Sequence, residues 1–404
     1  MITTTVCSAE VSTKDLKAVV SIADRMTRRS PRQHIKNLQI SLNGRARISW
    51  TNQEFRIQTS IPCDHLGEDL TVIVPAGDLL QVLKGTKAKR LEILPGEGSP
   101  EIPEFLFRAG SISRQLSPGT DLRKSVDKKG KETVSHSVPE IPPVDFDGIA
   151  VNVPAGEFIQ TIKSLSHAVD LESSRYALGG IHCTFSEGVL TMVSTDARRL
   201  AIRNIPADGL FTGEFNIPFS ALKTFSDLLP KKLVGSLSLI IRERGEEITT
   251  NESGKEITIE RNGKITLLYA DTALESPELQ GRFPRWRNVV PACGSNCVID
   301  RLELRELMAE LESQCTPESR GIDLKFAADL LVARGNYGSH KIIPVFCPGR
   351  VKLTVDPRFV REACDAIDSQ EIIFEFNGGE NAFVIRSPVP EIHTEVIMPL
   401  ARDR

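Results

Sequence analysis

The sequence predicts an α+β protein in which antiparallel sheet carries a few similar helices. One observation is a repeated unit, clearest in VIVPAGDLLQVLKG (72–85) and VNVPAGEFIQTIKSL (151–165), where a strand end and a Pro precede an amphipathic helical run. The other is a set of β-rich runs joined by dipeptides typical of hairpin turns. A few helices among many paired strands are characteristic of the α+β class.

The helix-starting unit occurs six times along the chain. Two further copies are FNIPFSALKTFSDLLP and LTVDPRFVREACDAI, and looser copies are AEVSTKDLKAVVSIADRM and CVIDRLELRELMAEL. A Pro just inside the helix start and a Ser or Asp cap explain the common pattern. Taken in pairs, these helices predict three similar domains, at residues 1–147, 148–292 and 293–404.

Between the helices, four dipeptides predict hairpin turns: Asn43-Gly44, Glu187-Gly188, Asn262-Gly263 and Asn377-Gly378. Glycine in such a turn supplies the positive φ that the backbone needs. The polar stretch DLRKSVDKKGKETVSHS (121–137) is interpreted as a solvated surface loop before the first domain boundary, because runs of charge usually face solvent.

The composition is that of a globular protein, with 404 residues of which 40% are apolar and 25% charged. No run approaches the roughly 18 apolar residues of a membrane span, and the N-terminus lacks the pattern of a secretory signal. We therefore expect a cytoplasmic location. The net charge of −3 is an average, and it leaves room for a local basic face that binds nucleic acid.

The residues that bind metals are dispersed. The eight cysteines and seven histidines show no zinc-site spacing, so we expect no metal and reduced, buried thiols. No P-loop or G-x-G-x-x-G follows a predicted strand, so we expect no nucleotide cofactor.

One short motif favours an enzyme. Ser220-Ala221-Leu222-Lys223 matches the S-x-x-K of serine β-lactamases, but it lacks companion motifs and lies within a repeated helix. A serine hydrolase using Ser220 and Lys223 therefore stays an alternative, and a protein without catalytic activity is the main hypothesis.

Four segments resemble the bacterial sliding clamp, the β subunit of DNA polymerase III. They are RYALGG (175–180), VSTDARRLA (193–201), GRFPRWRNVVP (281–291) and VIMPL (396–400). The chain has Ala197-Arg198 where that family commonly has Gly-His, and Asn288 where it has Arg, so a divergent member is expected. The alternative within this resemblance is a clamp-like paralogue that serves a specialised polymerase or plasmid replication.

The resemblance implies a head-to-tail homodimer that closes into a ring around duplex DNA, with the helices inside. Its partners would be the catalytic subunit of DNA polymerase III, the clamp loader and other proteins that carry a clamp-binding motif. Because a clamp must slide, its inner cations should contact phosphates, which carry no sequence information. The candidate DNA-facing residues are Arg28, Arg29, Arg32, Lys84, Lys163, Arg175, Tyr176 and Lys223.

The resemblance also implies a pocket for partner peptides between the second and third domains. Its candidate residues are Leu178, Thr195, Arg198, Arg199, Leu200, Pro284, Asn288, Val289, Val396, Ile397, Met398, Pro399 and Leu400. Aliphatic side chains, Met and Pro suit an adaptable apolar cleft, although core packing explains any one aliphatic equally well. The segments expected to meet in the dimer, Ser113–Leu116 and Ser313–Cys315, are polar for such an interface.

Overall fold

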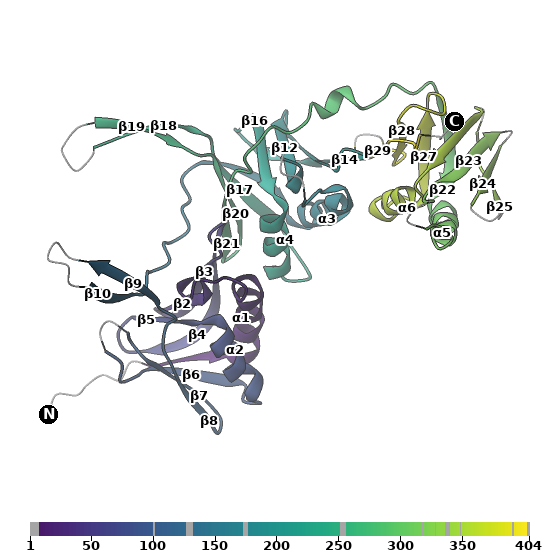
Figure 1. Cartoon of the computed structure of the whole chain (residues 1–404). Coiled ribbons are helices and arrows are strands. Elements are labelled where there is room, and N and C mark those ends of the chain that lie inside the picture. Colours follow the sequence, from purple (N-terminus) through teal and green to yellow (C-terminus); the bar gives the residue numbers. More distant parts are fainter. Residues whose placement is uncertain are drawn as a thin grey trace, which may run out of the picture. The chain divides into compact units, whose positions relative to one another are not determined.

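The computed structural model describes residues 8–99, 102–126, 132–172, 177–250, 256–316, 319–327, 329–335, 340–347, 349–389 and 392–401. The chain divides into two compact units (Figure 1). Unit 1 comprises Met1–Ile149, Lys223–Leu233 and Leu237–Pro277, and unit 2 comprises Ala150–Leu222, Val234–Ser236 and Glu278–Arg404. The predicted boundaries of three domains stay a prediction.

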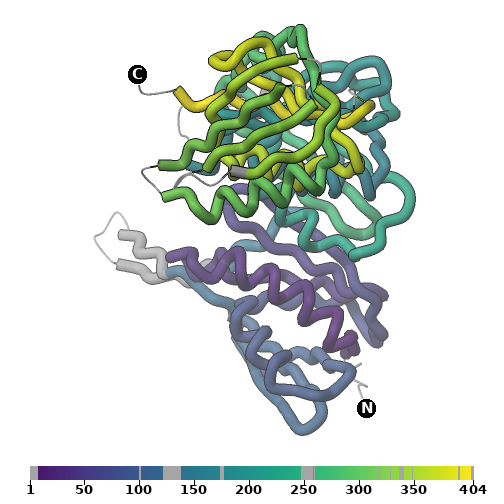
Figure 2. Tube along the Cα trace, turned by 90° about the vertical axis from the view of Figure 1, so that its right-hand side faces the viewer, coloured from purple at the N-terminus to yellow at the C-terminus, as the bar shows by residue number. Residues whose placement is uncertain are grey.

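All six predicted helices are confirmed within the described residues. They are α1 (Thr13–Thr27), α2 (Ala76–Gly85), α3 (Ala155–Leu165), α4 (Phe219–Leu228), α5 (Arg301–Glu312) and α6 (Pro357–Ala366). The Ser and Asp caps are those that the sequence indicates, since the side chains of Ser12, Asp300 and Asp356 accept backbone N–H groups at the starts of α1, α5 and α6. A Pro inside the helix start is found in α6, but Pro75 and Pro154 are the N-cap residues of α2 and α3 and so precede those helices. Helix α1 packs against α2 in unit 1, and α5 packs against α6 in unit 2 (Figures 1 and 2).

Unit 1 is built on an antiparallel sheet with the strand order β17-β20-β21-β4-β1-β6-β7-β8, on which β2, β3 and β5 also pair. Strand β8 lies at one end of this sheet. The first eight strands are β1 (Ser8–Ser12), β2 (Asn37–Leu42), β3 (Arg45–Thr51), β4 (Arg56–Leu66), β5 (Leu70–Pro75), β6 (Arg90–Pro95), β7 (Phe105–Ala109) and β8 (Ile112–Leu116). The others are β17 (Ser236–Arg242), β20 (Lys264–Tyr269) and β21 (Thr272–Pro277), with separate hairpins β9 (Asp121–Val126) to β10 (Glu132–Ser137) and β18 (Gly245–Thr250) to β19 (Glu256–Arg261).

Unit 2 contains an eight-stranded antiparallel sheet in the order β16-β12-β13-β14-β29-β28-β27-β22. Its strands are β12 (Gly180–Ser186), β13 (Val189–Thr195), β14 (Arg199–Pro206), β16 (Gly213–Pro218), β22 (Ser295–Asp300), β27 (Glu371–Phe376), β28 (Phe383–Arg386) and β29 (His393–Ile397). A four-stranded sheet, β25-β24-β23-β26, comprises β23 (Ile322–Ala327), β24 (Leu330–Arg334), β25 (His340–Pro344) and β26 (Val351–Val355). Strands β11 (Ile149–Pro154) and β15 (Asp208–Gly209) form a short antiparallel pair.

The eight-stranded sheet has two distinct faces, because neighbouring residues of a strand point to opposite sides. Ser194 lies opposite Ala201, which lies opposite Glu395, and the Ser194 hydroxyl donates a hydrogen bond to the last carbonyl of α3, that of Leu165. This is the helix face. Thr195, Leu200 and Val396 lie opposite one another on the other side, which we call the linker face, since residues 278–291 pack on it.

Three expectations about local structure are wrong. Asn262-Gly263 does not close a hairpin, because β19 pairs with β18 while β20 pairs with β17 and β21. Residues 121–137 are not a plain loop, since β9 and β10 pair along it. Glu187-Gly188 and Asn377-Gly378 do connect paired strands, as does Asn43-Gly44.

The third error concerns the cysteines. Cys297 and Cys347 form a disulfide, with their Cα atoms 4.4 Å apart. Hydrogen bonds in both directions between the backbones of Val298 and Phe346 hold the two segments together. The two cysteines are 50 residues apart in sequence, so no spacing pattern could have shown the pairing.

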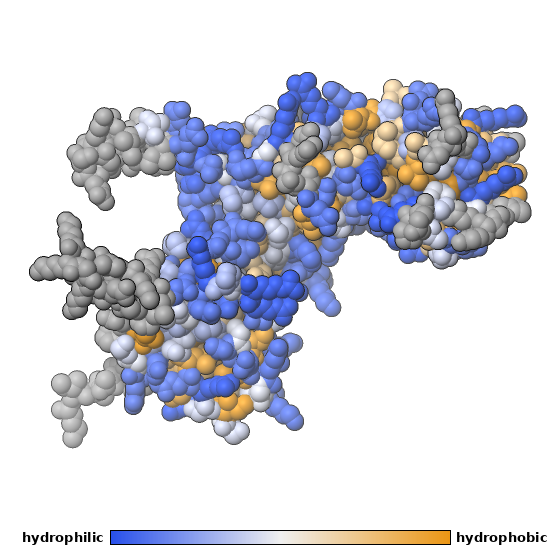
Figure 3. Space-filling view, in the orientation of Figure 1, coloured by the Kyte–Doolittle hydropathy of each residue, from blue (hydrophilic) through white to orange (hydrophobic). Residues whose placement is uncertain are grey.

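Among the described residues, none of the helices is both long and apolar enough to cross a membrane. Hydrophilic residues cover much of the viewed surface of each unit, with smaller hydrophobic areas between them (Figure 3).

Candidate functional site

The turn between β13 and β14 holds five residues of the segment 193–201 in a tight network. The hydroxyl of Thr195 donates to the carbonyl of Arg199 at 2.6 Å and accepts the N–H of Ala197 at 3.2 Å. Oδ1 of Asp196 accepts the N–H groups of Arg198 and Arg199, both at 3.0 Å. Ala197 has a φ of 68°, a left-handed conformation that favours glycine. The turn therefore has a left-handed backbone conformation at a position where the residue is alanine and not glycine.

Three of the predicted pocket residues meet on the linker face. Leu178, Leu200 and Val396 belong to one buried apolar cluster, together with Phe283 and Trp286. Leu178 enters it from the short 3-10 turn Ala177–Gly179, and Trp286 from the turn Trp286–Asn288. Thr195 lies opposite Leu200 on the same face. The segment 278–291 packs on these residues. Core packing is the other role that the sequence allows for their aliphatic side chains.

A cavity of about 570 Å³ lies beside this cluster. Two predicted pocket residues, Pro284 and Asn288, line it. Its other lining residues are His182, Glu214, Asn216, Glu278, Gly281, Arg282, Phe283, Arg285, Trp286 and Arg287. The resemblance to the clamp family implies pocket residues in the segment 281–291 but does not include its three arginines.

The wall of this cavity is aromatic and ordered. The rings of His182 and Phe283 stack with their centroids 4.7 Å apart, and His182 Nδ1 lies 2.8 Å from Oδ1 of Asn216. Burial lowers the pKa of His182, and the Asn216 hydrogen bond and Glu214 oppose that change only partly. His182 is therefore a neutral wall at neutral pH, and the arginines supply the positive charge.

The remaining predicted pocket residues are spread over the surface and the other face. Val289 and Met398 are 55% and 50% exposed, and the Met398 N–H donates to the Arg198 carbonyl at 3.0 Å. Pro399 and Leu400 are half-buried, and Arg198 is exposed. Arg199 and Ile397 lie opposite each other on the helix face, so the structure does not bring them to the cluster of Leu200.

Arg199 instead connects α3, α6 and the turn. Its Nε donates to Asp196 at 3.0 Å, its other nitrogens bond Glu362 and the carbonyl of His167, and its guanidinium lies 4.4 Å from the Phe359 ring centroid. Arg199 is buried, so this network satisfies a charge that would otherwise be costly to remove from water.

A buried histidine–carboxylate group lies on the helix face beside Arg199. Glu395 is fully buried, and its two oxygens lie 3.1 Å from His167 Nε2 and 2.7 Å from His393 Nε2. Burial alone would raise the pKa of Glu395, but the two imidazoles outweigh it and the net shift is downward. Burial would lower the pKa of His167, and Glu395 outweighs it, so that pKa is raised.

Sequence reasoning missed this group. His167 lies more than two hundred residues from Glu395, so only the fold brings them together. One local signal was present, since His393 and Glu395 are two residues apart in one strand and must share a face.

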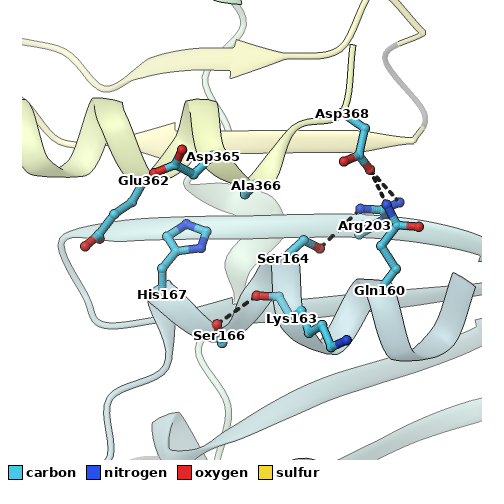
Figure 4. A pocket seen from close by; sticks show the side chains of 10 residues that line it. All are labelled: Gln160, Lys163, Ser164, Ser166, His167, Arg203, Glu362, Asp365, Ala366 and Asp368. Carbon is cyan, nitrogen blue, oxygen red and sulfur yellow. Dashed lines mark hydrogen bonds and ion pairs between the residues drawn. The ribbon is translucent and has the colours of Figure 1, made fainter. Parts of the chain in front are cut away.

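A second cavity, of about 310 Å³, lies between α3 and α6 (Figure 4). Buried Arg203 reaches Ser164 Oγ at 3.3 Å and Asp368 at 3.5 Å, and Gln160 donates to the same carboxylate at 2.5 Å. Glu362 and Asp365 line the α6 side, whereas Lys163 extends away from these carboxylates. The mixed charges suit a polar joint between two packed segments better than a site for one class of ion.

The predicted DNA-facing cations are exposed wherever the structure describes them. Arg28 caps the C-terminus of α1, with Arg29 and Arg32 following, and Lys84 and Lys163 lie in the last turns of α2 and α3. Lys223 is exposed and lies 3.5 Å from Asp227. Arg175 and Tyr176 fall outside the described residues.

Helix α5 is acidic, as the sequence indicates. Glu303, Glu306 and Glu310 are exposed, and Glu310 binds Lys341 at 2.7 Å. The cations nearby are engaged, with Arg305 2.5 Å from Asp365 and Arg361 2.5 Å from Glu312. Helices α5 and α6 therefore offer fewer unpaired positive charges than the end of α1 does.

The serine hydrolase alternative finds little support in the geometry. Ser220 is exposed on α4, and the amine of Lys223 lies 3.5 Å from the carboxylate of Asp227, one turn further along. Within the described part of the chain, no three or more His, Cys, Asp or Glu side chains gather as they would around a metal ion.

Comparisons with known proteins agree on one family. Residues 152–285 match the model of the DNA polymerase III beta subunit, central domain. The chain is 21% identical to the beta sliding clamp of Treponema pallidum over 87% of its length and 88% of that relative, and 20% identical to that of Pseudomonas aeruginosa over 95% and 97%.

Solved structures show the same fold. A Pseudomonas aeruginosa sliding clamp bound to griselimycin superposes with a TM-score of 0.81, at 16% identity, covering 98% of this chain and all 100% of that one. A Bacillus subtilis DNA polymerase sliding clamp gives 0.80 at 15% identity, with the same coverage. The predicted fold class is thereby confirmed.

Proposed function

The chain is a divergent member of the bacterial sliding clamp family, and on this premise we propose that it is a DNA polymerase processivity factor. Two copies close head to tail around duplex DNA without sequence preference. The ring tethers the catalytic subunit of DNA polymerase III and other proteins with clamp-binding motifs, and a clamp loader opens it. The protein has no catalytic role of its own, and it acts where the chromosome lies, in the cytoplasm.

The observation that carries this proposal is the two-faced sheet of unit 2. Helix α3, which carries Lys163, lies on the helix face together with α6, and the apolar cluster with its cavity lies on the linker face. A tether needs two binding surfaces that do not compete, one for phosphates and one for a partner peptide. Opposite faces of one sheet provide that separation.

The DNA-facing surface in this proposal consists of exposed cations at helix ends. Arg28, Arg29 and Arg32 are the strongest group, supported by Lys84, Lys163 and Lys223. Arg175 and Tyr176 belong to the same proposal on sequence grounds alone. Cations at the C-terminal end of a helix also interact favourably with the helix dipole, so these residues stabilise their helices as well.

The partner-peptide surface in this proposal is the linker face around Leu178, Leu200, Val396 and Pro284. Val289 and Met398 offer exposed apolar side chains, and Thr195, Arg198, Asn288, Pro399 and Leu400 complete the set. Arg199 and Ile397 support it from the helix face.

Ring closure is supported by an available sheet edge. Strand β8, which contains Ser113–Leu116, ends its sheet and leaves a row of backbone groups for another chain to pair with. Three similar domains, 1–147, 148–292 and 293–404, taken twice, would supply the repeating geometry of such a ring.

The experiment that tests the function is retention on closed DNA. The protein is loaded by the clamp loader of the same organism on nicked circular DNA, and the circle is then cut once. We expect the protein to stay on the circle in high salt and to leave after cutting, because a ring is held by topology. Equal retention on circular and linear DNA would overturn the proposal.

The hydrolase alternative has its own test. A Ser220→Ala variant should stimulate polymerase synthesis on primed DNA as well as the natural protein does. Loss of stimulation in a variant that still loads on circles would favour a chemical role for Ser220.

A further inference from the structure

We propose that the cavity lined by Arg282 and Arg285 binds an acidic segment of a partner protein, next to the peptide surface on the linker face. This inference rests on the proposed function, because it concerns the partners that the ring tethers. It adds to that function a charged subsite and the chemistry that this subsite selects.

The charge of the cavity is the first reason. Arg282, Arg285 and Arg287 are all exposed on it. Arg287 is engaged, since it lies 3.8 Å from Glu214 and 4.3 Å from the Trp286 ring centroid. In the described part of the chain, no ion pair occupies Arg282 or Arg285. Two guanidinium groups therefore remain available for carboxylates, to which their planar donors are well matched.

The second reason is that the cavity is a built site and not only a basic patch. Its volume of about 570 Å³ lies in the range of about 300–1,000 Å³ that is typical of ligand sites. Trp286, Phe283 and neutral His182 give it a rigid aromatic wall. The indole Nε1 of Trp286 is buried and has no hydrogen-bond partner among the described residues.

The third reason is continuity with the peptide surface. Pro284 and Asn288 belong to the proposed pocket and also line this cavity, and Phe283 and Trp286 belong to both the cavity and the apolar cluster. A peptide whose apolar residues lie on the linker face can therefore continue into the arginine cavity with adjacent acidic residues.

The position of the cavity favours a peptide over nucleic acid. His182 lies opposite Val193 on β13, so the cavity wall is on the linker face. Helix α3, which carries the candidate DNA-facing residue Lys163, packs on the other side of the same sheet. Phosphates held by the helix face cannot reach Arg282 and Arg285 through that sheet.

The test uses the full-length protein and five labelled peptides. The first is the clamp-binding segment of the polymerase III catalytic subunit from the same organism. The others carry the same segment extended by four glutamates or by four glutamines, each tail being tried at either end. We expect the glutamate tail to lower the Kd about three- to tenfold relative to the glutamine tail, in fluorescence anisotropy at 50 mM salt. The advantage should shrink at 300 mM salt.

Two double variants locate the effect. Arg282→Gln with Arg285→Gln should remove the advantage of the glutamate tail and leave the untailed peptide unchanged. Arg47→Gln with Lys325→Gln removes two exposed strand cations elsewhere and should keep the advantage. Both pairs are exposed, so neither change should unfold the protein.

Each outcome has a distinct meaning. If the untailed peptide binds but the two tails are equivalent, the acidic subsite is wrong and the proposed function stands. If none of the peptides binds, the tethering function fails. If Arg282→Gln with Arg285→Gln instead weakens the binding of a thymidine oligonucleotide and leaves the tail effect intact, the cavity is a nucleic-acid site and the inference is overturned.

Discussion

Nε2 of His167 lies 3.1 Å from Oε2 of Glu395, and this contact joins the segment after α3 to the last strand, β29. The strands themselves are also joined, since β14 pairs with β29. The carboxylate thus lies at the place where the sheet passes from strands before residue 219 to strands after residue 294. It is a fully buried charge whose partners come from both sides of that joint.

Glu395→Gln should destabilise the protein by about 3 kcal/mol, because it leaves His167 without its buried counter-charge and alters the hydrogen bond to His393. The measurement is urea-induced unfolding followed by circular dichroism at pH 6. Glu214→Gln is the matched control, since Glu214 pairs with His182 at 3.9 Å but is 60% exposed. It should change the stability by less than about 0.5 kcal/mol. Equal effects of the two changes would contradict the role of the buried group.

The stability should depend on pH through the same pair. The pKa of His167 is raised above 6.5, so its stabilising effect is complete below pH 6.5 and is lost as the pH rises through the raised value. The pKa of Glu395 is lowered below 4.5, so its effect is present above pH 4.5 and is lost as the pH falls through the lowered value. Unfolding midpoints between pH 4 and 9 should therefore pass through a maximum.

Glu395→Gln provides the check on that profile. Neighbouring Arg199 lowers the pKa of His167 and Glu362 raises it. These two groups therefore alter the pH at which the stability declines, and the direction of the change stays the same. In the variant, the decline above pH 6.5 should largely disappear. If the stability of the variant declines above pH 6.5 as much as that of the natural protein, other titrating groups cause the decline.

Ala197→Gly should stabilise the protein by about 0.5–1 kcal/mol, because Ala197 has a φ of 68°, where a Cβ is strained. The control is Ala201→Gly in the adjacent strand β14, which should destabilise by about 0.5–1 kcal/mol or more since it adds only flexibility and removes a buried methyl. The measurement is the free energy of unfolding in urea. A destabilised Ala197→Gly protein would show that the turn tolerates alanine without strain.

Replacing Arg28, Arg29 and Arg32 together by Gln should weaken the binding of duplex DNA and flatten its salt dependence. Each phosphate contact contributes about 0.9 to the slope of log K against log salt, so three lost contacts reduce it by about 2.7. The measurement is the affinity for end-blocked duplex at several salt concentrations.

The control for that experiment removes equal charge from strands. Arg47, Lys325 and Arg334 are exposed on β3, β23 and β24, and their replacement by Gln should leave the slope nearly unchanged. If both triple variants flatten the slope equally, only net charge matters and the helix-end cations have no special place.

The repeated elements were predictable because their signals are local. Six amphipathic runs with Pro, Ser or Asp at their starts became six helices, and turn dipeptides such as Asn43-Gly44 and Glu187-Gly188 marked real hairpins. Asn262-Gly263 failed because strand pairing is decided by distant partners: β20 pairs with β17 and β21 and not with the strand before it.

The candidate site was predictable only in part. Leu178, Leu200 and Val396 meet as the resemblance implied, but Arg199 and Ile397 point to the other face, because residues next to each other on a strand alternate. The buried group of His167 and Glu395, the Cys297–Cys347 pair and the arginine cavity depend on contacts between distant segments. No spacing rule reports such contacts.

The continuous eight-stranded sheet has a consequence for the exchange of partner proteins on DNA. In the proposed function, a protein on the linker face and a duplex at the helix face would share no side chain, so either could be exchanged while the other stays in place. One partner protein could then replace another on the linker face of the proposed ring while the DNA inside stays bound.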